Sequence, residues 1–318
     1  MAHTFTTALV TGGAGFIGSH LVEALAGSGC RVTVLDDLSS GHRANLDGSP
    51  GEVRFLQADI RDPEAVADAV AGCEVVFHLA AVVSVPQTAE DPLGSAAVNE
   101  TGSLLLFEAA RAARVRRVVF ASSSAVYGDE PTLPKREEMA PKPLSPYAVQ
   151  KLAVEHYLRV YTDLFGLASV GLRFFNVFGP RQDPSSPYSG VISIFMARAL
   201  SGNPPLIHGD GLQTRDFVFV GDVVRALIAA ANSPAAPGRV FNVGTGRAVT
   251  ILRLWEVIAA LAGARSSPGY GPPRPGDVPH SVAAIAAAQA ALGYAPRVGF
   301  EQGLEQTLAW YREKGTGR

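Results

Sequence analysis

Short apolar runs alternate with amphipathic segments along the first half of this chain. The apolar runs have the length of buried strands and lie at residues 8–11, 32–35, 53–56, 75–79, 118–121 and 169–175. Segments with a helical spacing of apolar residues lie between them, for example at residues 63–71 and 101–113. Buried strands that alternate with helices predict an α/β fold, a Rossmann-type doubly wound parallel sheet with right-handed crossovers.

The pattern changes after residue 175. Prolines and glycines are concentrated at residues 179–190, 202–211 and 268–279, which predicts a smaller, loop-rich C-terminal substrate-binding lobe. Residues 240–243 are again apolar and strand-like, and we expect this strand to return to the first sheet. The chain is therefore predicted to hold two interleaved domains, residues 1–175 and residues 176–318.

Composition and charge exclude several classes of partner. The 318 residues are 47% hydrophobic and 18% charged, with a formal net charge of −2, so the chain can bury a large core. The charges form no block of one sign, which argues against a nucleic-acid or membrane-surface partner. Cys30 and Cys73 lack the number and spacing of a disulfide framework or a metal site. No basic, apolar leader and no apolar stretch of ~20 residues is present, so we expect a cytoplasmic protein without a metal.

A glycine-rich loop joins the first predicted strand to the first predicted helix. Gly12, Gly13, Gly15 and Gly18 allow a tight turn and bring the backbone close to a pyrophosphate at a helix N-terminus. Asp36 ends the second predicted strand, where a carboxylate binds a ribose 2′-hydroxyl and repels a 2′-phosphate. These features predict an NAD site rather than an NADP site; the alternative is an ordinary strand–helix turn.

A second group of residues suggests proton transfer. Tyr147 and Lys151 are four residues apart in the segment SPYAVQK, so a helix would place them on one face, about one turn apart. There the ammonium would favour the phenolate by at most about 4 kcal/mol, or roughly three pKa units. Ser122, Ser123 and Ser124 end the fifth predicted strand, where a hydroxyl can bind both a substrate hydroxyl and the Tyr147 oxygen. The alternatives are a chance pair on a helix surface and a serine-rich loop.

With these motifs the chain resembles the extended short-chain dehydrogenase/reductase family, in particular nucleotide-sugar 4-epimerases of the UDP-glucose / UDP-N-acetylglucosamine type. The resemblance covers nearly the whole chain and rests on TGGAGFIGSH, LDDLSSGH, ADIRD, HLAA, SSSAVYGD, SPYAVQK, RFFNVFGPRQDP, TRDFVFVGDV and RPGDV. It implies a redox-neutral, NAD-dependent isomerase. Tyr147 would take the proton of the sugar 4-hydroxyl while the C4 hydride passes to NAD⁺, and the 4-keto sugar would turn over before the hydride returns.

The resemblance also implies roles for single residues. The catalytic residues would be Ser123, Tyr147 and Lys151, with Ser124 adjacent. Cofactor-binding positions would be Gly12, Gly15, Phe16, Ile17, Asp36, Asp37, Asp59, Ile60, Leu79, Ala80, Ala81, Asn99, Ser122, Tyr147, Lys151 and Phe174. Substrate-binding positions would be Ser123, Asn176, Gly190, Val191, Leu206, His208, Arg215, Arg274, Asp277 and Ser281. The expected partners are a UDP-sugar and a second copy of the chain, paired through residues 101–113 and 147–165.

Four other functions remain open on the same fold. Sugar-nucleotide 4,6-dehydratases resemble this chain but carry Asp-Glu where it has Ser124 and Ala125, and UDP-glucuronate decarboxylases usually carry Glu at the second of these positions. A UDP-glucuronate epimerase and a non-catalytic NAD-sensing module are the further alternatives. The chain departs from the family at residues 282–287, which replace a polar segment, and at Val83, where some relatives have a small residue. Ser281 stands where hexose-limited relatives carry a bulky aromatic residue, so we expect N-acetylated sugars to fit as well.

Overall fold

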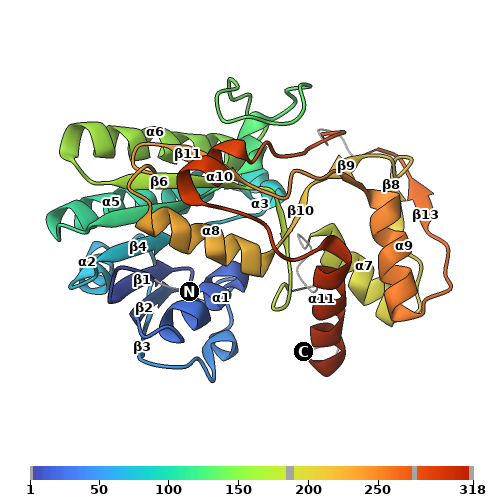
Figure 1. The fold of residues 1–318 in the computed structure, drawn as a ribbon, viewed down its shortest axis with the longest axis horizontal. Coiled ribbons are helices and arrows are strands. Elements are labelled where there is room, and N and C mark those ends of the chain that lie inside the picture. Colours follow the sequence, from blue (N-terminus) through green and yellow to red (C-terminus); the bar gives the residue numbers. More distant parts are fainter. Residues whose placement is uncertain (1–2, 184–189, 274–277, 315–318) are drawn as a thin grey trace.

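The computed structural model describes residues 3–183, 190–273 and 278–314. Its centre is a seven-stranded sheet in the order β11-β6-β5-β4-β1-β2-β3 (Figure 1). Every pair of neighbouring strands in this sheet is parallel. The strands are β1 (Thr7–Thr11), β2 (Arg31–Asp36), β3 (Val53–Gln57), β4 (Val75–His78), β5 (Arg117–Ser123), β6 (Ser169–Phe174) and β11 (Val240–Val243). The predicted doubly wound parallel sheet is confirmed.

Helices cover both faces of the sheet because its strands are buried on both sides. In β1, Val10 belongs to one apolar core and Leu9 to the other, as the two-residue period of a strand requires. The core around Val10 is completed by α1 (Phe16–Ala26), α8 (Val220–Asn232) and α10 (Ala286–Leu292). The core around Leu9 is completed by α2 (Pro63–Val70), α5 (Ser103–Ala112) and α6 (Pro146–Phe165).

A smaller group of elements packs beside the carboxyl ends of the strands (Figure 1). Three two-stranded sheets lie there, made of β7 (Asn176–Phe178) with β10 (Phe217–Phe219), β8 (Leu206–His208) with β13 (Gly269–Gly271), and β9 (Thr214–Arg215) with β12 (Val249–Thr250). They share an apolar core with α7 (Val191–Leu200), α9 (Ile251–Ala262) and α11 (Phe300–Lys314). The strand expected at residues 240–243 is β11, which pairs with β6 in the large sheet. The domain boundary at residue 175 stays a prediction.

Several helices begin where the sequence places a capping residue before a proline. Asp62, Asp91 and Ser145 accept backbone N–H groups at the starts of α2, α4 (Pro92–Ala96) and α6, and each is followed by Pro. The helix expected at residues 101–113 is α5, which continues from a π-helical turn at Ala97–Gly102. The remaining short helices are η1 (Arg43–Leu46), α3 (Val85–Glu90) and η3 (Ser124–Tyr127).

In residues 3–183, 190–273 and 278–314 no helix is both long and apolar enough to cross a membrane. The same ranges contain no group of three or more His, Cys, Asp or Glu side chains arranged to hold a metal ion. The parallel strands end at a common edge, where doubly wound sheets bind their ligands, and the candidate residues lie at this edge.

Candidate active site

The glycine-rich loop packs directly on neighbouring backbone. Gly12 has a φ of +68°, and a Cβ atom at this position would lie 2.7 Å from the backbone nitrogen of Ala80. A Cβ atom at Gly18 would lie 2.1 Å from the carbonyl oxygen of Gly12. Gly15 caps α1 without a side chain, so the first N–H groups of the helix face outward for an anion. The loop therefore has the close backbone approach that a dinucleotide pyrophosphate requires.

Asp36 fixes this loop as well as ending β2. Its side chain is buried, and its two carboxylate oxygens accept the N–H groups of Ala14 and Leu38, each at 2.9 Å. Burial raises the pKa of Asp36, while the hydrogen bonds from Leu38 and Ala14 oppose this shift. Each carboxylate oxygen has a second lone pair, so Asp36 can also accept a ribose hydroxyl.

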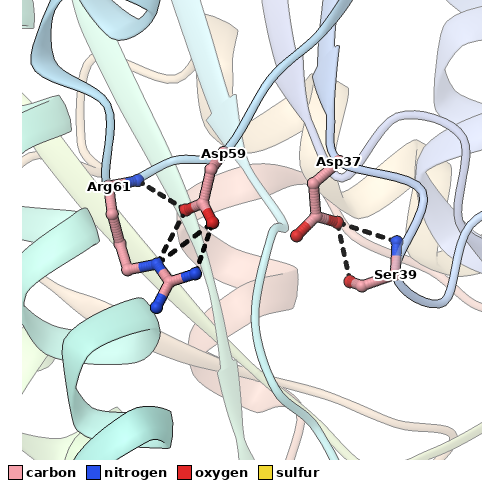
Figure 2. Close-up of polar contacts among 4 residues, drawn as sticks. All are labelled: Asp37, Ser39, Asp59 and Arg61. Carbon is pink, nitrogen blue, oxygen red and sulfur yellow. Dashed lines mark hydrogen bonds and ion pairs between the residues drawn. The ribbon is translucent and has the colours of Figure 1, made fainter.

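Two further carboxylates lie at neighbouring strand ends and project to the same side (Figure 2). Asp37 is exposed and accepts the N–H and the hydroxyl of Ser39 at 2.9 and 2.6 Å. Asp59 accepts the backbone N–H of Arg61 at 2.8 Å and its guanidinium at 2.5 to 3.1 Å. These bonds lower the pKa of Asp59 and keep the carboxylate charged. Both side chains of the Asp59–Arg61 pair are partly exposed, so its main effect is orientation rather than stability.

Arg61 was not among the residues singled out from the sequence. Its signal is the ADIRD segment, in which the arginine follows Asp59 by two residues. Asp37 also attracts the Arg61 guanidinium. Arg61 therefore partly compensates the negative charge at the ends of both β2 and β3.

Asn99 acts on the chain segment that follows β4. Its side-chain oxygen accepts the N–H of Val82 at 2.8 Å, and its amide nitrogen donates to the Val82 carbonyl at 3.0 Å and to Gln150 at 2.7 Å. Thr11 binds the same segment, since its hydroxyl accepts the N–H groups of Leu79 and Ala80, both at 3.2 Å. These contacts of Asn99 and Thr11 hold the backbone of the HLAA segment and of Val82 after it. The expected contact between Asn99 and the cofactor stays a prediction. Ile60, the other predicted residue nearby, is buried against Gly102.

Ser123, Tyr147 and Lys151 come together between β5 and α6. Ser145 caps α6, so Tyr147 lies in the first turn and Lys151 one turn later. The Ser123 side chain lies near enough to Tyr147 to lower its pKa, and its hydroxyl accepts the N–H of Ala125 at 3.1 Å. Lys151 is buried, and its Nζ donates to the carbonyl of Ala121 at 2.8 Å. The Lys151 Nζ lies 5.8 Å from the centre of the Tyr147 ring.

Burial governs the charge of both groups. It raises the pKa of Tyr147, and the hydrogen bond from Ser123 opposes that shift. Burial also lowers the pKa of Lys151 to about 7, while the charge of Glu155 opposes that shift. The spacing argument assumed a fully charged ammonium at ~4 Å, whereas burial brings the pKa of Lys151 down to about 7. Depression of the Tyr147 pKa by Lys151 therefore stays a prediction.

The side chain of Ser122 points away from the other two serines. It is buried and donates to a carboxylate oxygen of Glu155 at 2.5 Å. Ser124, in contrast, opens η3 beside Ser123. Alternation along a strand sends neighbouring side chains to opposite faces. The sequence did not show which of the three serine hydroxyls would face the site.

Most of the described substrate-binding positions lie in the smaller group of elements, whereas Ser123 ends β5 of the large sheet. Asn176 opens β7, and Gly190 and Val191 open α7; the predicted cofactor-binding residue Phe174 ends β6. Leu206 and His208 belong to β8. Arg215 is in β9, where its guanidinium donates to the carbonyls of Thr214 at 2.8 Å and Pro279 at 3.3 Å. Ser281 donates its N–H to the carbonyl of Thr214 at 3.1 Å, which brings it beside Arg215. Arg274 and Asp277 lie outside the described residues.

Comparison with known proteins identifies the family. Residues 8–244 match the model of the NAD dependent epimerase/dehydratase family. The chain belongs to this family. It is 44% identical over 310 residues to the UDP-glucose 4-epimerase of Mycolicibacterium smegmatis, an alignment that covers 96% of this chain and 98% of the relative.

Solved structures agree with this assignment. The UDP-N-acetylglucosamine 4-epimerase from Methanobrevibacter ruminantium, in complex with UDP-N-acetylmuramic acid, is 40% identical with a TM-score of 0.94, covering 98% of this chain and 99% of that one. The Thermus thermophilus UDP-glucose 4-epimerase in complex with NAD is 41% identical with a TM-score of 0.87, covering 96% and 99%. The protein is therefore an NAD-dependent enzyme of the epimerase/dehydratase family.

The residues present fit the family's cofactor. The cradle leaves no room for a Cβ atom at Gly12 or Gly18, and a Cβ atom at Gly15 would lie 3.2 Å from the carbonyl oxygen of Gly12. The outward N–H groups of α1 suit a pyrophosphate. Asp36 and Asp37 place negative charge at the end of β2, which suits a free ribose hydroxyl and repels a 2′-phosphate. This arrangement agrees with NAD as the cofactor.

Asp216 is a further residue that was not singled out from the sequence, and its carboxylate joins three segments of the smaller group of elements. Asp216, between β9 and β10, is fully buried and accepts the N–H groups of Thr245 at 2.7 Å, Gly246 at 2.9 Å and Ala283 at 3.1 Å. Burial raises the pKa of Asp216, and these hydrogen bonds oppose the shift. Asp216 precedes a strand in the TRDFVFVGDV segment, but its partners are distant in sequence and only the fold assembles them.

Proposed function

We propose that this protein is a UDP-sugar 4-epimerase that interconverts UDP-glucose and UDP-galactose through a transient 4-keto intermediate. The observation that carries this proposal is the site between β5 and α6, where Ser123 acts on Tyr147, the buried Lys151 lies one helical turn beyond Tyr147, and the uncharged Ser124 and Ala125 follow Ser123. Dehydration would need an additional acid and base next to Ser123. Ser124 and Ala125 supply neither, which favours epimerisation within this family.

The residues of the chain would supply orientation and proton transfer. Ser123 would hold the sugar 4-hydroxyl against the Tyr147 oxygen, and Tyr147 would remove its proton. The chemistry that NAD supplies when bound is the removal and return of the hydride at sugar C4. Tyr147 would return the proton after the keto sugar has turned its other face. The buried position of Lys151 indicates a site from which water is largely excluded, which strengthens each of these interactions.

The same proposal assigns the diphosphate and base to the smaller group of elements. Arg215 presents a guanidinium beside the Ser281 segment, and guanidinium groups pair with phosphate oxygens through two parallel hydrogen bonds. Asn176 would bind the diphosphate from β7, and the backbone of Leu206 and His208 would contact the base. Arg274 and Asp277 are proposed as further ligands on the family resemblance alone.

A panel of UDP-, dTDP- and GDP-sugars, including UDP-glucuronate, tests the reaction. We expect NMR to show the C4 epimer of UDP-glucose or UDP-galactose at equilibrium. A 4-keto-6-deoxy product would identify a dehydratase, and a UDP-pentose would identify a decarboxylase. The absence of any product, together with no bound NADH absorbance on adding a UDP-sugar, would favour a non-catalytic NAD-sensing module instead.

We further propose that N-acetylated sugars are accepted, because Ser281 is small where hexose-limited relatives carry a bulky ring. Ser281→Tyr is expected to suppress turnover of UDP-N-acetylglucosamine at least ~10-fold while sparing UDP-glucose, since a blocked acetyl group forfeits on the order of 1.4 kcal/mol or more of transition-state binding. Turnover of both substrates in parallel assays is the measurement, and Ser281→Ala serves as the control that keeps the residue small. Equal losses on both substrates, or no wild-type turnover of the N-acetylated sugar, would contradict the hypothesis.

We propose that the protein is a homodimer. Val149, Tyr157, Val160 and Leu164 are 49%, 38%, 45% and 70% exposed and follow a helical spacing along α6. A second copy would cover this apolar face and remove it from water. Sedimentation equilibrium is expected to give twice the 33.3 kDa mass of one chain; a monomer throughout the micromolar range would contradict this proposal.

We also propose a cytoplasmic location. Cys30 and Cys73 are both free and buried, a state that suits a reducing compartment. Cell fractionation tests the proposal, and recovery of the protein in a membrane or secreted fraction would oppose it.

A further inference from the structure

Glu155 is a buried acid on the catalytic helix, one turn beyond Lys151. It is 6% exposed, and one carboxylate oxygen accepts the hydroxyl of Ser122 at 2.5 Å and the Nε of Arg173 at 2.9 Å. The other oxygen accepts the Nη2 of Arg173 at 2.7 Å. The carboxylate is thus bound by two neighbouring strands, because Ser122 belongs to β5 and Arg173 to β6.

Arg173 is itself held in place. Its side chain is 3% exposed, its Nη1 donates to the carbonyl of Glu137 at 3.4 Å, and its Cζ lies 4.8 Å from the centre of the Tyr127 ring. Tyr127 in turn donates its hydroxyl to Asn242 of β11 at 2.7 Å. Strands β5, β6 and β11 therefore share one buried polar network, and Glu155 cannot move without breaking it.

Because of this network, Glu155 pairs with other residues and forms no hydrogen bond with Lys151 among the described residues. Among the residues that the structure describes, Glu155 forms its ion pair with Arg173 and none with Lys151. Lys151 instead donates to the carbonyl of Ala121, which leaves two of its three N–H donors for other partners. A direct pair would draw the ammonium toward Glu155 and away from Tyr147.

The charge of Glu155 nevertheless acts on Lys151. It raises the pKa of Lys151 against the larger effect of burial. Among the described residues, the other titratable groups that face Lys151 are Tyr147 on the same helix and His78 on β4, and Arg173 of β6 brings a cation close by through its bonds to Glu155. His78 is bound at both ring nitrogens, by Thr11 and Ser103, and burial lowers its pKa to about 3, so it is neutral. Glu155 is thus the nearby group that brings negative charge to Lys151 at neutral pH.

We propose that Glu155 is the positioning residue that keeps Lys151 charged during the reaction. Held by Ser122 and Arg173, its carboxylate supplies fixed negative charge behind the ammonium without occupying an N–H donor of Lys151. The ammonium can then support the Tyr147 phenolate and remain available to a ribose hydroxyl. This inference rests on the proposed function, in which Tyr147 and Lys151 form the proton-transfer pair.

The chain allows a direct test because lysine occurs at four positions only, 135, 142, 151 and 314. The NAD-loaded protein, labelled with ¹³C at lysine Cε, is titrated by NMR, and Lys151→Arg assigns the Lys151 signal. We expect a wild-type midpoint near 7. Glu155→Gln should lower the midpoint by about one pH unit, because an anion near the ammonium is lost. Arg173→Gln should raise it, because a cation near the ammonium is lost while Glu155 remains.

Opposite shifts distinguish the proposal from a merely structural role. Both variants break the same ion pair, so a role limited to packing would move Lys151 in the same direction in both, or not at all, and would overturn the inference. Glu155→Asp should restore the midpoint to within a few tenths of a pH unit of the wild type. Glu74→Gln removes a carboxylate bound by Thr6 outside this network and should leave Lys151 unchanged.

The readout does not depend on turnover, so it separates two failures. Loss of the proposed epimerisation with the expected opposite shifts would contradict the function and leave the electrostatic role of Glu155 intact. If Arg173→Gln does not fold, Glu155→Gln is compared with Glu155→Asp, and equal midpoints in these two variants would overturn the inference. In an active enzyme, Glu155→Gln should also move the alkaline loss of kcat to lower pH by the same amount as the NMR midpoint.

Discussion

Replacing Tyr147 with phenylalanine is expected to lower turnover by at least ~10²-fold, the usual effect of removing an acid–base group. Phenylalanine keeps the ring and loses only the hydroxyl, whose pKa Ser123 lowers. NAD should still be retained, because the glycine cradle and Asp36 are unchanged. The measurement is the rate of C4 epimerisation, combined with the amount of NAD(H) released on denaturation.

Tyr157→Phe is the matched control for this experiment. Tyr157 lies on the same helix, is 38% exposed and is far along α6 from the first turn. Phenylalanine keeps the ring that the proposed dimer face uses and removes only the hydroxyl, so turnover should stay within about twofold of the wild type. Near-normal turnover of Tyr147→Phe would show that another group transfers the proton. Loss of turnover in both variants would point to disruption of α6 instead.

Replacing Gly12 with alanine is expected to weaken NAD binding by at least ~10-fold, which corresponds to about 1.4 kcal/mol. A Cβ atom there would lie 2.7 Å from the Ala80 nitrogen and 3.0 Å from its Cα, and both are backbone atoms that cannot rotate away. The loop must therefore move off the end of β4, and the N–H groups that face the pyrophosphate move with it. Calorimetric titration of NAD into nucleotide-free protein measures the change.

Gly29→Ala separates this steric effect from backbone strain. Gly29 also has a left-handed backbone, with a φ of +88°, but a Cβ atom there meets nothing within 4 Å. Both variants carry the cost of about 1–2 kcal/mol for an alanine in this conformation, and a denaturant titration should show a comparable loss at Gly29. NAD affinity should fall for Gly12→Ala alone. Equal affinities in the two variants would contradict the assigned role of the loop.

The sequence predicted those parts of the site that depend on local geometry. The glycine loop between β1 and α1, Asp36 at the end of β2, and the four-residue spacing of Tyr147 and Lys151 on α6 all follow from contacts within one strand–helix unit. The strand at residues 240–243 was recognised by its apolar run, and it does enter the large sheet as β11. Local patterns suffice in these cases because periodicity and capping act over a few residues.

The partners of buried polar groups could not be predicted in the same way. Asp216 collects N–H groups from residues 29, 30 and 67 positions away, and Glu155 meets Ser122 and Arg173 across 33 and 18 positions. Each of these side chains would be an ordinary surface residue in another fold. Burial forces them to pair, but which groups are brought within reach depends on how the helices pack on the sheet.

The sequence by itself determined the doubly wound sheet, the glycine loop and the spacing of the proposed proton-transfer pair, because these are set by periodicity, glycine conformation and helical geometry. Only the tertiary structure decided the charge of that pair. Burial shifts the pKa of Lys151 to about 7 and opposes ionisation of Tyr147, and Glu155, fixed by two strands, acts in the other direction. A charge state depends on everything that surrounds a group in space, and that surrounding exists only in the folded chain.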